Sequence, residues 1–65
     1  MNEVVFTIEK DGKYYNLYTT TKEFKNNNRK CSDDTLFVLM ESISDNVAEH
    51  DGVCMFRIGK EHEDV

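Results

Sequence analysis

Residues 32–52 read SDDTLFVLMESISDNVAEHDG, and this stretch decides the fold. Its apolar residues recur at the spacing i, i+3, i+4 and i+7, which predicts a helix with one buried face. These residues are Leu36, Leu39, Met40, Ile43 and Val47. Ser32 is a suitable N-cap, and Gly52 can adopt the left-handed conformation that ends many helices. We therefore expect one amphipathic helix between these two residues.

The opposite side of the predicted helix carries a row of carboxylates, namely Asp34, Glu41, Asp45 and Glu49. No Lys or Arg occurs between Asp33 and Asp51. Like charges four residues apart destabilise a helix by roughly 0.2–0.5 kcal/mol per pair. A row that keeps this repulsion indicates a surface used for binding. An acidic face that only improves solubility is the alternative interpretation.

The first part of the chain predicts a β-hairpin. Alternate residues of segment 3–9 are apolar, which is typical of a half-buried strand. Asp11-Gly12 then separates it from a second strand over residues 14–20, and this dipeptide favours a two-residue turn with positive φ at both positions. The register that follows places Ile8 opposite Tyr15. Every second residue of the two strands then lies on one apolar face.

The remaining segments complete an α+β fold of order ββαβ. Residues 20–31 are expected to form a connection with a single helical turn around Phe24. Residues 53–59 predict a third strand, in which Cys54, Phe56 and Ile58 face the helix. We expect a three-stranded, mainly antiparallel sheet with the third strand beside the first, although pairing parallel to the second strand is an alternative. The helix would cover one face of this sheet.

Length and charge restrict the class of protein. The 65 residues predict one small domain, with residues 59–65 expected to fray. The net charge of −5 divides into +2 for residues 1–30 and −7 for residues 31–65. The acidic half disfavours nucleic acid and anionic membranes as partners and favours a basic protein. The chain has no apolar run of about 20 residues and no basic start of a signal peptide, so we expect a cytoplasmic protein.

The residues that usually carry catalysis or metal binding do not converge. Cys31 precedes the predicted helix and Cys54 follows it, about 25 Å away, whereas bridged Cα atoms lie within about 7 Å. His50 shares one end with Cys54, and His62 is placed near the other. The sequence contains no phosphate-binding loop, nucleophile elbow or HExxH motif. We therefore expect no disulfide, no metal, no cofactor and no enzymatic activity.

Two further surfaces are candidates for binding. The sheet face away from the helix would expose Val5, Tyr14, Tyr18 and Met55, a patch that would suit a homodimer because Tyr and Met are enriched in interfaces. The segment 22–30 is basic, and beside the exposed tyrosines it would suit single-stranded nucleic acid. The acidic half of the chain opposes this third possibility.

Carboxylates recur through the second half of the chain, at Asp33, Asp34, Glu41, Asp45, Glu49, Asp51, Glu61, Glu63 and Asp64. In this charge pattern, its size and its compact αβ plan, the chain resembles small early proteins that bacteriophages make to disable host factors. Some of those proteins mimic DNA with rows of carboxylates. The resemblance implies a host-takeover inhibitor acting in the host cytoplasm, whose acidic helix face occupies the basic surface of a host nucleic-acid-binding protein. The basic segment 22–30 departs from a pure DNA mimic.

Overall fold

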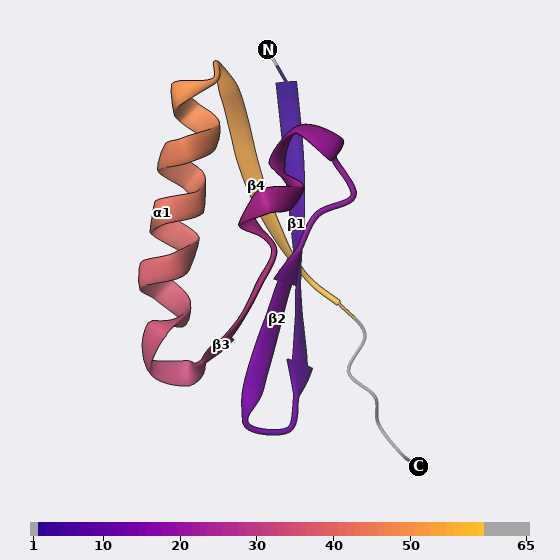
Figure 1. Cartoon of the computed structure of the whole chain (residues 1–65), viewed down its shortest axis with the longest axis vertical. Helices are drawn as coiled ribbons and strands as arrows, with labels where there is room; N and C mark the ends of the chain where they lie inside the picture. The colour runs from indigo at the N-terminus through magenta and orange to yellow at the C-terminus, as the bar shows by residue number, and fades with distance from the viewer. Residues whose placement is uncertain (1, 60–65) are drawn as a thin grey trace.

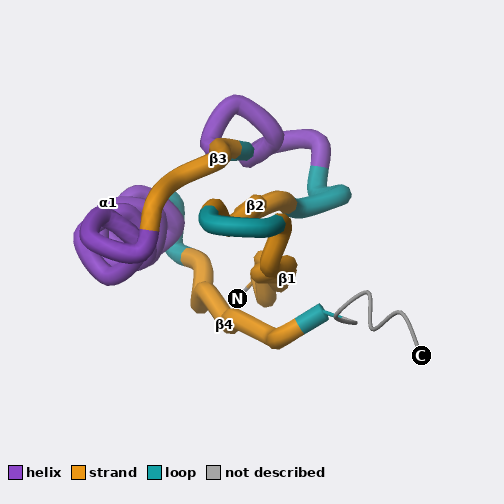
Figure 2. The backbone as a smooth tube through the Cα atoms, turned by 90° about the horizontal axis from the view of Figure 1, so that it is seen from below, coloured by secondary structure: helices purple, strands orange, loops and turns teal. Residues whose placement is uncertain are grey.

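The computed structural model describes residues 2–59, which form a four-stranded mixed sheet with one α-helix beside it (Figures 1 and 2). The strands are β1 (Asn2–Asp11), β2 (Tyr14–Tyr18), β3 (Arg29–Ser32) and β4 (Gly52–Ile58). The helices are the 3₁₀ segments η1 (Lys22–Asn27) and η2 (Asp33–Thr35) and the α-helix α1 (Leu36–Glu49). The strand order across the sheet is β3-β2-β1-β4. The expected α+β class, with one helix and a sheet, is confirmed.

The hairpin of β1 and β2 forms, but its turn and register differ from the expectation. The turn residues are Gly12 and Lys13, and only Gly12 has a positive φ, of 63°. A glycine at the first of two turn positions is the requirement of a type II′ turn, which spares Asp11 the left-handed conformation. Ile8 therefore pairs with Leu17 instead of Tyr15. The shift is by two residues, so the predicted apolar face is kept.

β3 is an additional strand that the sequence did not predict. It pairs antiparallel with β2 and forms one edge of the sheet. The Asn28 side chain prepares this pairing, because its Oδ1 accepts the Thr19 backbone N–H (2.9 Å) and its Nδ2 donates to the Thr19 carbonyl (3.5 Å). The predicted connection over residues 20–31 is therefore largely structured.

Because β3 adds one reversal of the chain, the helix and the last strand run in the opposite directions to those expected. β3 runs parallel to β1, so α1 returns against that direction and β4 again runs parallel to β1 (Figure 1). The prediction that the last strand lies beside the first is confirmed. The prediction that these two strands are antiparallel is wrong, because it counted one reversal of the chain too few. The predicted three-stranded sheet is likewise corrected to four strands.

α1 is shorter than predicted at both ends. The 3₁₀ segment η2 occupies residues 33–35, and Ser32 makes no side-chain capping bond to the backbone. At the other end, Asp51 adopts the left-handed conformation (φ 59°) that was expected of Gly52. Gly52 is required for a different reason, since a Cβ there would lie 2.8 Å from Cγ1 of Val47. The chain can therefore pass closely from α1 into β4.

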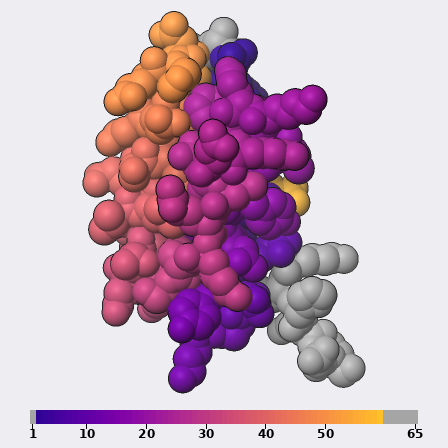
Figure 3. Space-filling model, in the orientation of Figure 1, coloured from indigo at the N-terminus to yellow at the C-terminus, as the bar shows by residue number. Residues whose placement is uncertain are grey.

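The core lies between the sheet and α1, and η1 closes one end of it. Its buried members are Val4, Phe6, Ile8, Leu17, Phe24, Cys31, Ile43 and Val47. The Phe6 and Phe56 rings pack with centroids 6.1 Å apart, and Phe24 meets His50 edge-on at 5.5 Å. The space-filling view shows the magenta segment that contains η1 and β3 lying against the orange helix (Figure 3). The predicted burial of Phe24, Ile43 and Val47 is confirmed, whereas the other stripe residues, Leu36, Leu39 and Met40, are half-buried against the core.

The end of β4 differs from the expectation in two ways. Ile58, predicted to face the helix, is 75% exposed, because β4 diverges from α1 towards its end (Figure 1). Gly59 was included in the segment expected to fray, yet it is buried and its N–H donates to the Ile8 carbonyl (2.8 Å). The rest of that expected segment, residues 60–65, lies outside the described residues.

Candidate protein-binding surfaces

The outer face of α1 contains a surface hollow with three carboxylates. We call it the acidic hollow; it is lined by Asn27 from η1 and by Val38, Glu41, Ser42, Asp45, Asn46 and Glu49 from α1. Residues four apart rise about 6 Å along a helix, so Glu41, Asp45 and Glu49 form one evenly spaced row. All three side chains are exposed. The helix thus holds the negative charges at fixed intervals on a surface that a partner can reach.

These carboxylates form no ion pair within the part of the chain that the structure describes. There, a single ion pair occurs, between Lys30 Nζ and Asp11 Oδ2 (3.2 Å), and it lies on the sheet. The Asn27 Nδ2 donates to Asn46 Oδ1 (3.2 Å), which joins η1 to the border of the hollow. The rim is therefore fixed by neutral amides, and the charge of the carboxylate row remains available to a partner.

The four predicted helix-face residues do not form one group. Glu41, Asp45 and Glu49 come together in the acidic hollow. Asp34 is exposed as well, but it belongs to η2 and does not line the hollow. The break between the 3₁₀ segment and α1 changes the angular position that a continuous helix would have given Asp34.

Two apolar side chains on the outer face of α1 were missed. Phe37 is 76% exposed and Val38 is 68% exposed, and Val38 lines the acidic hollow. Their helical positions lie outside the buried stripe, which was a sufficient signal of exposure. An apolar contact beside carboxylates suits a Lys or Arg side chain, whose aliphatic stem packs on apolar surface while its charged end binds oxygen.

The sheet face opposite α1, which we call the open face, brings three of its four predicted residues together, since Val5 is the neighbour of Met55 and lines a hollow with Tyr18. Val5 and Met55 pair directly between β1 and β4, and both are exposed. Tyr18 is less available, because its hydroxyl donates to Glu9 Oε2 (2.7 Å). This hydrogen bond to a carboxylate is the main reason why the pKa of Tyr18 is raised above its ordinary value of 10.0. Burial and the negative charge of Glu9 raise it further. Beside it, Arg57 Nε donates to Thr7 Oγ1 (3.2 Å).

Tyr14, the fourth predicted residue of this face, lies apart at the hairpin end. The Lys30 ammonium lies 5.6 Å from the centroid of the Tyr14 ring and also binds Asp11. The predicted basic segment 22–30 is divided between two elements: Lys22 and Lys25 belong to η1, whereas Arg29 and Lys30 belong to β3. Tyr14 and Lys30 therefore meet at the hairpin end, where both line one hollow, whereas Tyr18 lies beside Val5.

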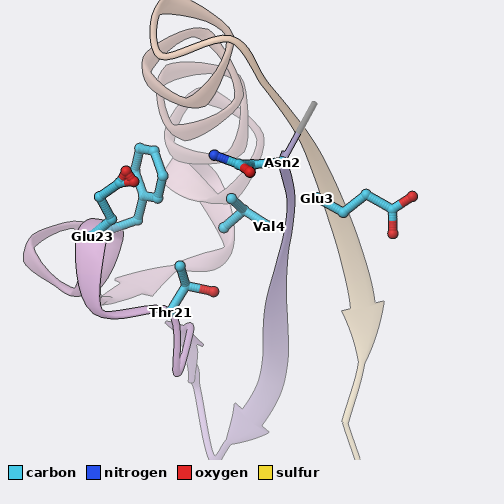
Figure 4. A pocket seen from close by; sticks show the side chains of 6 residues that line it. Asn2, Glu3, Val4, Thr21 and Glu23 are labelled. Atoms are coloured by element: carbon cyan, nitrogen blue, oxygen red, sulfur yellow. The ribbon is translucent and has the colours of Figure 1, made fainter.

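Another hollow lies where β1 begins beside η1. Its lining comes from Asn2, Glu3, Val4, Thr21, Glu23 and Phe24. Figure 4 shows Val4 and Thr21 between the two segments, whereas the Glu3 side chain points away from them. The lining contains no Lys, Arg, His or Cys, so it brings together few groups that would support catalysis.

Both cysteines are free thiols. Cys31 was interpreted as a loop residue, but it is buried in β3, whereas Cys54 lies half-buried in β4. Two strands lie between them, about 14 Å across the sheet, and they are level with Lys10 and Val4 of β1, which adds an offset of about 20 Å along the strands. Burial raises the pKa of the Cys54 thiol. Residues 2–59 contain no cluster of three or more His, Cys, Asp or Glu side chains that would hold a metal ion.

Comparisons of the chain with models of known protein families, with curated proteins and with solved structures found no match. Among the helices of residues 2–59, none has the length and apolar content needed to cross a membrane.

Proposed function

We propose that this protein is a non-enzymatic inhibitor or regulator that binds a basic protein through the outer face of α1. The partner is a nucleic-acid-binding protein, and the acidic hollow occupies the surface that its Lys and Arg side chains use to contact phosphate. The observation that carries the proposal is the row of Glu41, Asp45 and Glu49, which are exposed, evenly spaced and without an ion pair among residues 2–59.

Charge and geometry support this partner class. Basic surfaces that bind nucleic acid gain most of their affinity from regularly placed phosphates. A helix that presents a carboxylate about every 6 Å offers similar charges on a rigid support. Val38 adds an apolar contact for the stem of an incoming side chain. Binding of this kind should weaken as the salt concentration rises.

The test replaces Glu41, Asp45 and Glu49 together by Lys and measures capture of nucleic-acid-binding proteins from a host lysate at several salt concentrations. We expect the wild-type chain to retain a basic protein at low salt, to release it at high salt, and to compete with DNA or RNA for it. The triple variant should lose this capture. Capture that survives the triple substitution and depends little on salt would contradict the proposal.

A matched control keeps the number of substitutions and changes the place. Glu23, Asp33 and Asp34 are exposed carboxylates outside the acidic hollow. Their joint replacement by Lys changes the net charge by the same amount, so it should preserve capture if position matters. Equal loss in both variants would show that only the net charge attracts the partner.

A second candidate function is docking of a protein partner through the open face. It is favoured by the direct pairing of Val5 and Met55, two exposed apolar side chains on neighbouring strands. Val5→Lys places a charge in this patch without touching α1 or the core. Capture or self-association that is lost in Val5→Lys, but kept in the helix triple variant, would favour this candidate.

A further inference from the structure

The outer edge of β4 has backbone groups available for pairing. The Gly59 N–H donates to the Ile8 carbonyl, and Ile8 pairs with Ile58 in the parallel ladder. Because backbone groups alternate in direction along a strand, the N–H and C=O groups of Cys54, Phe56 and Ile58 then point away from β1. β4 is the last strand of the sheet on this side, and no segment of residues 2–59 pairs with it there.

The two edges of the sheet differ in how they are protected. β3 spans Arg29–Ser32, so it is short and begins with two cationic residues. Short length and basic side chains are common ways to keep an edge strand from pairing with another chain. β4 spans Gly52–Ile58, contains no Lys or Pro, and carries one charge, on Arg57. Its exposed side chains include Val53, Met55 and Ile58. β4 therefore lacks the features that keep an edge strand from pairing with another chain.

The edge is complementary to itself when two copies run antiparallel. Full overlap of Gly52–Ile58 with the same segment centres the pair on Met55. The outward groups of Cys54 then face those of Phe56 in the second copy, as a hydrogen-bonded pair requires. The exposed Ile58 lies opposite Gly52 of the second copy, which has no side chain to obstruct it. A large side chain thus meets the smallest residue at each end.

Charges also favour this arrangement over a parallel one. In the antiparallel pair, Arg57 lies opposite Val53 of the second copy, and Val53 is the neighbour of Glu3 in β1. The Arg57 of one copy and the Glu3 of the other then lie two strands apart, about 10 Å, on the same face, which is an attractive placement, while Arg57 Nε keeps its hydrogen bond to Thr7 Oγ1 of its own copy. A parallel pair would instead place the two Arg57 side chains together, which is unfavourable.

We propose that this protein forms a symmetric dimer in which the β4 edges of two copies pair antiparallel and join their sheets into one. The twofold axis of such a pair is perpendicular to the sheet, so both α1 helices lie on the same side of the dimer. The two acidic hollows then face the same way and double the acidic surface offered to a basic partner. The dimer itself depends on β4 and not on the proposed function of α1.

The test measures molecular mass by sedimentation equilibrium and amide hydrogen exchange by NMR at low and at high protein concentration. We expect the mass to rise from 7.6 kDa towards twice this value. The outward amides of Cys54, Phe56 and Ile58 should exchange at least about tenfold more slowly at high concentration. The amides of Met55 and Arg57 point towards β1, so they serve as internal controls and should be protected at both concentrations.

Two charge variants test the register. Met55→Lys and Met55→Glu should each raise the dimer dissociation constant roughly fivefold, because like charges then lie opposite each other at the centre of the pair. An equimolar mixture of the two variants should restore dimerisation by forming a mixed pair. Val5→Lys is the matched control, since Val5 lies beside Met55 on the open face but away from the edge, and it should leave the dimer intact.

Three results would overturn the proposal. The first is a molecular mass that stays at the monomer value at every concentration. Protection of the β4 amides that appears only when a different protein is added belongs to this result, because the edge then pairs with another partner. The second is a dimer in which those amides exchange as in the monomer, which would indicate packing through the open face. The third is a mixture of the Met55 variants that associates no better than either variant alone.

Discussion

The outer face of α1 and the outer edge of β4 offer a partner opposite kinds of chemistry. The helix face presents the carboxylates of Glu41, Asp45 and Glu49, and away from the helix ends its backbone groups are paired within the helix. The β4 edge carries one charge and presents unpaired backbone N–H and C=O groups beside apolar side chains. The first surface suits a cationic partner, whereas the second suits another strand.

The difference between these surfaces predicts opposite responses to salt. Attraction between exposed charges is screened within about 10 Å at 0.1 M salt, so binding at the acidic hollow should weaken as salt is added. Strand pairing at β4 relies on hydrogen bonds and apolar contact. It should be unchanged or strengthened by salt, because the repulsion between two chains of net charge −5 is then reduced. Salt therefore separates the two modes in a single protein.

The substitution with the largest expected effect unfolds the chain, so it should abolish binding through both surfaces. Phe6 is fully buried in β1 and packs against Phe56 of β4. Phe6→Ala should cost about 3–5 kcal/mol, as truncation of a buried aromatic residue does. This is comparable to the whole stability that a core of this size supplies. We expect an unfolded chain by circular dichroism at 25 °C, without capture or dimerisation.

Phe37→Ala is the matched control for this substitution. The same side chain is removed from the outer face of α1, where it is 76% exposed. The free energy of unfolding, measured with urea, should change by no more than about 0.5 kcal/mol. A large loss of stability at Phe37, or a small one at Phe6, would contradict the placement of these residues.

A substitution on the outer face of α1 should change stability by a smaller amount. Asp45 lies four residues from both Glu41 and Glu49, so Asp45→Lys replaces two repulsive pairs by two attractive ones. We expect the free energy of unfolding to increase by about 1 kcal/mol at low salt, with a smaller gain for Asp45→Asn. Binding to a basic partner should nevertheless weaken. A variant that is both more stable and fully active in capture would show that the carboxylate row is not used for binding.

The smallest effect concerns the open face beside β4. The Tyr18 phenol donates to Glu9, which favours its neutral form and raises the pKa of Tyr18. The stabilisation should be fully present below the unfolded tyrosine pKa of about 10 and should be lost as the pH rises through the higher folded pKa. The difference in unfolding free energy between wild type and Tyr18→Phe, measured against pH, checks this direction. Glu9→Gln should lower the Tyr18 pKa, followed by ultraviolet absorbance, and an unchanged titration would refute the contact.

Much of the candidate helix surface was predictable from local periodicity. The 3.6-residue repeat placed Ile43 and Val47 in the core, and it placed Glu41, Asp45 and Glu49 on the exposed side. The same repeat also indicated that Phe37 and Val38 are exposed, although the prediction did not use it. Asp34 was misplaced because a 3₁₀ segment at the start of the helix does not alter the sequence spacing that the prediction relied on.

The strand pairings were less predictable, because a strand depends on neighbours that are distant in sequence. Segment 29–32 is short, begins with two charged residues and lacks apolar alternation, so nothing local marks it as β3. It becomes a strand because the second side of β2 needs hydrogen-bond partners and Asn28 fixes the chain beside Thr19. Missing this strand reversed the predicted direction of β4.

The sequence by itself determined the amphipathic helix, the apolar face of the hairpin and the existence of the last strand, because periodicity and turn chemistry are local properties. Only the tertiary structure decided the pairing of β3, the parallel direction of β4 and the two-residue shift of the hairpin. It also decided which surfaces remain open. The helix covers one face of the sheet and leaves the β4 edge unpaired within residues 2–59, so the edge becomes a candidate interface only once the neighbours of every strand are known.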